Sequence, residues 1–386
     1  MAAPGPDEDV AAELERSAGR ARARGGLAAA AAFLERTVML TIDPARRAGR
    51  ALAAARIKGQ AGGFGTAVDL LTMAEAGPLT EFQHAHADLL RGRVAFFANR
   101  GSDAPPLLLR AARRFEPIDA DLSRAAYLDS PTAAVFAGRL ASPGGGVLEV
   151  ARAIAAAPRP LRAPRAPDLL LAGLAARCNK GYAAGLPILR EALTTFGRGM
   201  SADEELRWLW LACLAALQIW DDNRWELLST RFVQLARGAG SLSELPFALN
   251  VRASMLLFAG ELGAAAALAD EVQAVAEVTG TNRTFYTHLG LAALRGDESA
   301  ALAMIEGTTR DAAGRGEGIV ITIAGWADAV LSNGLGRYRQ AVTASQQATS
   351  YEGDLGTSNW AVVELIEAAE RDGGIPRAAG YAAPRT

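Results

Sequence analysis

The chain has 386 residues, of which 50% are hydrophobic and 6% aromatic, and its 40 basic and 42 acidic side chains give a net charge of −2. This length is far above that at which a hydrophobic core becomes marginal, and no basic stripe stands out, so we do not expect electrostatic binding of nucleic acid. The longest uncharged run, Trp208 to Trp220, is too short to span a membrane.

The two cysteines and the N-terminus bear on the cellular compartment. Cys178 and Cys213 are the only cysteines, and two thiols fit reduced core residues of a cytosolic protein better than a disulfide framework. The segment that begins at Met1 is acidic and lacks the apolar stretch of a secretion signal. The sequence therefore predicts a cytoplasmic protein.

The first predicted elements are helices arranged in pairs. After a flexible leader at residues 1–7, we expect three helical pairs. The start of the third helix is marked by Asp43, a typical N-cap residue, and by Pro44, which suits the first helical position. The predicted helices cover residues 8–24 with 27–41, 45–60 with 64–75, and 79–99 with 105–115.

A short turn motif recurs between these helices and along the rest of the chain. A small or turn-prone residue is followed two positions later by an apolar residue and, three positions after that, usually by a small one. Glycine suits the turn because it adopts the left-handed conformation without a Cβ clash. The motif starts at Gly25, Gly62, Lys180, Asn223, Gly260 and Gly336, and turn signals at Gly101, Gly138 and Gly296 fill the gaps.

The steps between these nine positions range from 36 to 43 residues, which is the length of two helices and two turns. One such pair cannot bury its own apolar faces, so neighbouring pairs must stack. The sequence therefore predicts an all-α fold, a tetratricopeptide-like α-α superhelix of about nine helical pairs.

The middle and the end of the chain interrupt this rhythm. Pro131 falls inside an otherwise helical stretch and is expected to kink or split it. A proline-rich connector at residues 158–167 is expected to join an N-terminal repeat segment, residues 8–157, to a C-terminal one, residues 168–372. We expect a disordered tail at residues 373–386.

Two local patterns place helices in the C-terminal repeat segment. Ser201 and Glu204 have the spacing of a capping box before an apolar run. The strand-like run from Gly318 to Ile323 lies in a helical context, and we interpret it as a buried helix.

The sequence offers no catalytic, cofactor or metal site. Lys58 and Lys180 are the only lysines and neither lies in a phosphate-binding loop. His84 and His86 point to opposite sides of a helix, and His288 stands alone, so we expect no metal site. The prediction is a protein that is not an enzyme and needs no cofactor.

Aromatic residues form the one enrichment that could mark a binding surface. Four of the six tryptophans lie within 18 residues, beside two aspartates. Aromatic side chains act as anchors in binding sites, but ordinary packing between repeats explains the same pattern. The candidate partner or ligand surface consists of Trp208, Trp210, Trp220, Asp221, Asp222 and Trp225.

Several segments resemble a known family. Residues 10–26, 100–110, 205–213 and 333–338 are similar to the helical-repeat middle region of large ATP-binding LuxR-type transcriptional regulators of the maltose-activator kind, and the resemblance covers about residues 8–372. It implies a region that senses an inducer or a partner protein, between a nucleotide-binding module and a DNA-binding helix-turn-helix. This chain lacks both modules, which are expected only in a full-length relative, so direct DNA binding by this segment is not expected.

The resemblance leaves two main hypotheses for function. The first is the regulatory sensor region of such a regulator, with this reading frame as a truncated or fragmentary version of it. The alternative is a stand-alone tetratricopeptide-like scaffold for protein interactions. The inducer, the partner and the regulated genes are not specified by the sequence.

Overall fold

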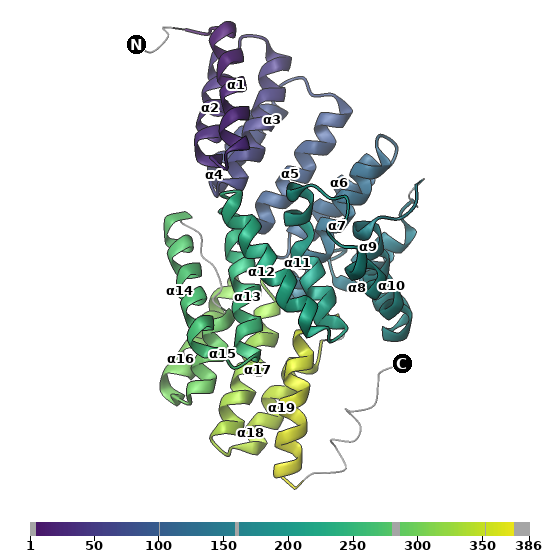
Figure 1. The fold of residues 1–386 in the computed structure, drawn as a ribbon, viewed down its shortest axis with the longest axis vertical. Helices are drawn as coiled ribbons and strands as arrows, with labels where there is room; N and C mark the ends of the chain where they lie inside the picture. The colour runs from purple at the N-terminus through teal and green to yellow at the C-terminus, as the bar shows by residue number, and fades with distance from the viewer. Residues whose placement is uncertain (1–4, 100, 159–161, 280–285, 352, 374–386) are drawn as a thin grey trace.

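A computed structural model of the chain describes residues 5–99, 101–158, 162–279, 286–351 and 353–373 (Figure 1). This part of the chain contains helices and connecting turns, and no β-strand. The helices are α1 (Glu8–Ala23), α2 (Leu27–Leu40), α3 (Pro44–Gln60), α4 (Phe64–Glu75), α5 (Glu81–Asn99), α6 (Ala104–Phe115), α7 (Ala120–Ala137), the 3-10 helix η1 (Gly138–Leu140), α8 (Val147–Ala156), α9 (Ala166–Lys180), α10 (Tyr182–Thr195), α11 (Ala202–Gln218), α12 (Asp222–Gly238), α13 (Leu245–Phe258), α14 (Leu262–Thr279), α15 (Tyr286–Arg295), α16 (Glu298–Arg315), α17 (Ile319–Gly334), α18 (Tyr338–Thr349) and α19 (Thr357–Arg371).

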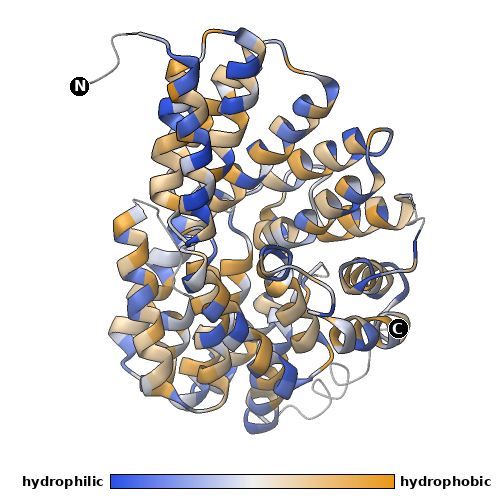
Figure 2. Ribbon diagram, turned by 45° about the horizontal axis from the view of Figure 1, so that its top comes forward, coloured by the Kyte–Doolittle hydropathy of each residue, from blue (hydrophilic) through white to orange (hydrophobic). Residues whose placement is uncertain are grey.

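The helices pack in consecutive pairs, which confirms the all-α superhelix. Nine pairs run from α1–α2 to α17–α18, and α19 packs against α17 and α18 at the end of the described chain. The turns between paired helices use left-handed residues as expected, for example Gly25 (φ 75°) and Gly62 (φ 86°). Hydrophobic and hydrophilic residues are interspersed along most helices (Figure 2), as expected of helices that bury one face against their neighbours.

Specific local predictions are also confirmed. The carboxylate of Asp43 accepts a hydrogen bond from the Arg46 N–H at 2.7 Å and caps α3. Ser201 and Glu204 form a reciprocal capping box at the start of α11. The strand-like run after Gly318 begins helix α17.

Pro131 does not split its helix, and the expected kink stays a prediction. Pro131 lies inside α7, which continues without a break to Ala137. The residue is buried, and α7 packs against α6, α8, α9, α11 and α17. Packing on this many sides offsets the hydrogen bond that the proline removes.

Two turns also differ in register from the sequence motif. Asn223 lies in the first turn of α12, and the left-handed residue before that helix is Trp220 (φ 58°). Lys180 is the last residue of α9, and Gly181 (φ 89°) makes the turn.

The later repeats fold back onto the first ones. The turn after α1 lies against the turn after α12, where a Cβ atom on Gly25 would lie 2.7 Å from the Gly238 carbonyl oxygen. The Gly318 N–H donates a hydrogen bond of 3.0 Å to the Ala137 carbonyl, which joins α17 to the end of α7. Arg139 donates to the Gln347 carbonyl at 3.2 Å. Consecutive turns of the superhelix are therefore in direct contact, and α11–α13 lie between the first and the last helices (Figure 1).

The predicted division of the chain at residues 158–167 stays a prediction. Residues 159–161 lie outside the described residues, but the flanking segments are joined: Arg124 of α7 donates to the carboxylate of Asp168 at 2.7 Å, and Arg162 donates to the same carboxylate at 2.8 Å. The buried hydrophobic residues form two clusters that divide near α5, one over α1–α5 and one over α5–α19. Most of the predicted tail, residues 374–386, and residues 1–4 of the leader also lie outside the described residues.

No helix in the described part of the chain is both long enough and apolar enough to cross a membrane.

Candidate functional site

A cavity of about 630 Å³ opens on the inner face of the superhelix. Helices α1–α7 line one side of it, and α11–α13 with the turn before α13 line the other. Because the two walls come from different turns of the superhelix, the cavity exists only when the later repeats have folded back onto the first. Its volume is typical of ligand-binding pockets, which measure about 300–1,000 Å³. We call it the inner cavity.

The inner cavity has charged and aromatic walls. Its lining has as many basic as acidic residues. These are the four arginines and four acids Arg22, Arg56, Arg93, Arg207, Asp129, Asp203, Glu204 and Glu244. Aromatic side chains from α5, α11 and α13 line the same space: Phe96, Phe97, Trp210 and Phe247. A site of this kind can hold a ligand that presents both a charged group and an apolar one.

One carboxylate in the inner cavity is shared by two arginines. Arg207 donates to both oxygens of Asp129, from Nε at 3.0 Å and from Nη2 at 2.8 Å. Arg93 donates to the same carboxylate from Nε alone, at 2.8 Å. Burial raises the pKa of the Asp129 carboxyl, but Arg207 and Arg93 outweigh it, so the pKa lies below its ordinary value. Asp129 is therefore an ionised bridge between α5 and α11.

Two arginines of the inner cavity retain unused donors. The Nη2 atom of Arg93 is buried, and no described residue accepts a hydrogen bond from it. Arg56 of α3 has neither a hydrogen bond nor an ion pair within the residues that the structure describes, and its side chain is half-buried. Burial lowers the pKa of Arg56, and the neighbouring Arg22 lowers it further, while Asp203 raises it. Among the described residues, Arg56 therefore has no acceptor, and Arg93 keeps one enclosed donor without an acceptor.

A smaller apolar pocket adjoins the inner cavity. It has a volume of about 90 Å³, and Trp210 and Phe247 line both spaces. Further aromatic walls come from Phe136, whose ring centroid lies 5.1 Å from that of Trp210, and from Trp225 and Trp360. The first space has charged walls and the second is mainly apolar, and we call the two together the inner groove.

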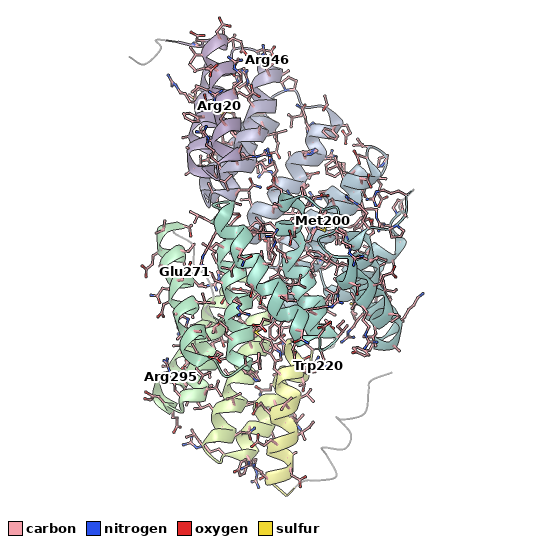
Figure 3. The ribbon with its side chains drawn as sticks, viewed as in Figure 1. Arg20, Arg46, Met200, Trp220, Glu271 and Arg295 are labelled. Atoms are coloured by element: carbon pink, nitrogen blue, oxygen red, sulfur yellow. The ribbon has the colours of Figure 1, made fainter. Side chains whose placement is uncertain are left out.

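The structure separates the four predicted tryptophans. Trp208 is buried in the core, and the Cζ atom of Arg207 lies over its ring, 5.3 Å from the ring centroid. Trp210 lines the inner cavity. Trp225 joins Trp210 in the apolar pocket, while Trp220 is 60% exposed at the turn between α11 and α12 (Figure 3).

The two predicted aspartates have roles at a helix end. Asp221 is the N-cap of α12, where its carboxylate accepts a hydrogen bond from the Arg224 N–H at 3.1 Å. Asp222 is exposed in the first turn, where an acidic residue complements the helix dipole. The predicted surface as a whole stays a prediction, and within it Trp210 and Trp225 are the two residues that meet at the inner groove.

The left-handed backbone of Trp220 leads to a stability prediction. Non-glycine residues are strained in this conformation by about 1–2 kcal/mol, and equivalent turns of this chain use glycine. We expect Trp220→Gly to be more stable than Trp220→Ala by about 1 kcal/mol, measured as the difference in free energy of unfolding in urea. Equal stabilities of the two variants would show that the turn relaxes to another conformation when the indole is removed.

The two cysteines are free thiols. Burial raises the pKa of Cys178 to about 11 and also raises that of the fully buried Cys213. Neither is a thiolate near neutral pH, so neither is activated as a nucleophile. No cluster of three potential metal ligands occurs among the described residues.

Sequence reasoning missed the arginines of the inner cavity. Arg22, Arg56 and Arg93 follow one another by 34 and 37 residues, close to one repeat, on α1, α3 and α5. Residues one repeat apart on the first helices of successive pairs can line the same inner face. That recurrence was a visible signal, whereas the approach of Arg207 from α11 depends on the folding back of the chain.

Comparisons with known proteins give similarities of fold alone. No family model matches the chain, and no curated protein matches it. Among solved structures, a Rap protein complexed with competence and sporulation factor aligns over 97% of this chain and 96% of its own, with 10% identity and a TM-score of 0.49. Yeast Tom70 aligns over 97% of this chain and 91% of its own, with 11% identity and a TM-score of 0.36. Similarities this low transfer no function to this chain.

Proposed function

We propose that the chain is a non-catalytic helical-repeat scaffold that binds a short segment of a partner protein in the inner groove. The observation that carries this proposal is the inner cavity of about 630 Å³, which combines partly unpaired guanidinium groups with aromatic walls. Grooves between helices that present aromatic pockets and a few polar groups are a recurring way of recognising peptides.

Trp210 is the anchor residue in this proposal. Its side chain is only partly buried, it lies against Phe136, and it lines both the inner cavity and the apolar pocket. A hydrophobic side chain of a bound peptide that reached the apolar pocket would contact the indole. Tryptophans in such positions are frequent hot spots of binding energy.

The test is a selection of binders from a displayed library of random heptapeptides with the full chain immobilised, followed by calorimetry with the selected peptides. Loss of a hot-spot contact costs about 2 kcal/mol or more, so Trp210→Leu is expected to weaken binding at least tenfold. The matched control is Trp220→Leu, which removes an exposed indole outside the inner groove and is expected to leave the affinity unchanged. A library that yields no binder, or equal losses in both variants, contradicts the proposal.

The resemblance to LuxR-type regulators would assign the same groove to an inducer or to a regulatory partner. The segment around Asn333 and Tyr338 that contributes to the resemblance is a helix end and turn between α17 and α18. Sequencing the genomic DNA on either side of the reading frame tests this context, because phosphate-loop and helix-turn-helix codons are expected there if it holds. Their absence leaves the stand-alone scaffold.

A further inference from the structure

We infer that the apolar pocket of the inner groove receives a tyrosine of the bound segment, whose phenol hydroxyl donates a hydrogen bond to the Oδ1 atom of Asn250. This inference rests on the proposed function, because it names the side chain that the partner segment places in the same groove. Three features of the pocket support it: an accessible acceptor, uncharged aromatic walls, and a volume that suits a single ring.

Asn250 gives the pocket a hydrogen-bond acceptor that the chain does not use. Its Nδ2 atom donates to the Pro246 carbonyl at 2.9 Å, which leaves Oδ1 as the free end of the amide. No described residue donates to Oδ1, and this atom is not among the enclosed polar atoms that lack a partner, so it is accessible. Because Asn250 is only 7% exposed and lines the apolar pocket, the accessible atom faces the pocket.

Ser254 lies one turn further along α13 and lines the same pocket. Serines in helices often donate to the carbonyl four residues earlier, but the Ser254 hydroxyl has no hydrogen bond within the described chain. The other two hydroxyls at the pocket are used by the chain: Tyr286 donates to Glu317, and Thr357 donates to Asp354 at 2.6 Å. The two polar residues of α13 are therefore the ones whose oxygens remain for a ligand.

The walls of the pocket are aromatic and uncharged. Six rings line it, those of Phe136, Trp210, Trp225, Phe247, Tyr286 and Trp360, and none of the described lining residues is charged. An aromatic side chain gains edge-to-face and offset contacts with such walls beyond the burial of its area. A charged side chain would lose its hydration there without a counter-ion. The pocket therefore favours a ring that carries a neutral hydrogen-bond donor.

The size of the pocket selects a single ring. Its volume is about 90 Å³, whereas a closed cavity of about 150 Å³ holds one benzene molecule. The pocket is open to solvent, and its lining includes the partly exposed side chains of Trp210, Val251 and Trp360, so a phenol can enter in part. An indole also carries a neutral donor but is larger than this space, so tyrosine is favoured over tryptophan.

The experiment uses three fluorescein-labelled pools of degenerate heptapeptides, with a central Tyr, Phe or Trp. Binding to the full chain is measured by fluorescence anisotropy. The Tyr and Phe pools differ only in the hydroxyl that donates to Asn250. We expect the Tyr pool to bind about tenfold more tightly than the Phe pool, because the hydroxyl satisfies a buried acceptor, and more tightly than the Trp pool.

The variant is Asn250→Leu, which removes the acceptor and keeps a side chain of similar size. The Pro246 carbonyl lies within α13 and retains its helical backbone hydrogen bond, so the fold is expected to be retained. The Tyr pool should lose about tenfold in affinity, while the Phe pool should bind at least as tightly as before. The control is Asn179→Leu on α9, outside the inner groove, where Nδ2 also donates to a backbone carbonyl, that of Ala151 at 3.0 Å. This control should keep the preference for Tyr.

The outcomes separate this inference from the proposed function. Equal binding of the Tyr and Phe pools overturns the hydrogen bond to Asn250 while the scaffold function stands. An equal loss of both pools in Asn250→Leu also overturns it, because the amide then acts on the shape of the groove or on the peptide backbone. A Trp pool that binds as tightly as the Tyr pool overturns the limit to a single ring.

Binding of none of the pools, together with an empty heptapeptide library, overturns the proposed function itself. The pocket is then tested with p-cresol, the side chain of tyrosine without a peptide, by ligand-observed nuclear magnetic resonance. Binding to the wild type that Asn250→Leu abolishes supports a phenol pocket on a chain that is not a peptide scaffold. Absence of p-cresol binding up to its solubility limit overturns the phenol pocket as well.

Discussion

Replacement of Asp129 by Asn is expected to lower the free energy of unfolding by about 3 kcal/mol. The carboxylate is largely buried and accepts hydrogen bonds from Arg93 and Arg207, so its neutralisation leaves two neighbouring cations without their shared counter-ion. The measurement is urea denaturation followed by circular dichroism. Asp222→Asn, which neutralises an exposed aspartate, is the control and should change the free energy by less than about 0.5 kcal/mol.

The Asp129→Asn variant is also expected to differ from the wild type in how its free energy of unfolding depends on pH. The folded pKa of Asp129 lies below its unfolded value of about 3.9, so its contribution to stability is complete above that pH and is lost as the pH falls through the folded pKa. Wild-type protein is therefore expected to lose stability more steeply than Asp129→Asn below about pH 4. Parallel slopes for the two proteins would mean that the carboxylate is not ionised in the folded state.

Replacement of Gly318 by Ala is expected to destabilise the protein by about 1–3 kcal/mol. A Cβ atom at this position would collide with the Ala137 carbonyl oxygen and crowd the Arg139 N–H, where α17 packs against the end of α7. The backbone of Gly318 has an ordinary helical φ of −70°, so the expected loss reports the contact between the two segments and not strain in the backbone.

The control for Gly318→Ala is Gly314→Ala in the preceding helix. Gly314 has no atom within 4 Å of its added Cβ, and alanine favours a helix interior over glycine, so this variant should gain up to about 1 kcal/mol. Thermal denaturation distinguishes the two, with midpoints that shift in opposite directions. A gain of stability in Gly318→Ala would show that α17 is not held against α7 in solution.

The sequence predicted the helices better than the site because helices depend on local patterns. The first six predicted helices agree with α1–α6 to within two residues at each end, since glycine turns and N-caps such as Asp43 mark their limits. Pro131 does not split α7, because tertiary packing around the helix outweighs the loss of one backbone hydrogen bond.

The candidate site was predictable only in part. The cluster of tryptophans was visible in the sequence, and Trp210 does line the inner groove. The position of Trp220 in a left-handed turn was not foreseen, because that conformation normally indicates glycine. The meeting of Arg93 with Arg207 across Asp129 joins helices whose residues are more than 70 positions apart, and no local pattern encodes such a contact.

The contacts between successive turns of the superhelix, at Gly25 with Gly238 and at Ala137 with Gly318, bear on how the protein folds and unfolds. In an open array, each repeat touches its neighbours alone, and unfolding can proceed from one end as a series of nearly independent steps. Here residues about 180 to 210 positions apart must meet. Closing such long loops has a high entropic cost, so folding is expected to be slow for a helical protein. The same long-range contacts couple the first repeats to the last, which favours a single cooperative transition over stepwise fraying from the ends.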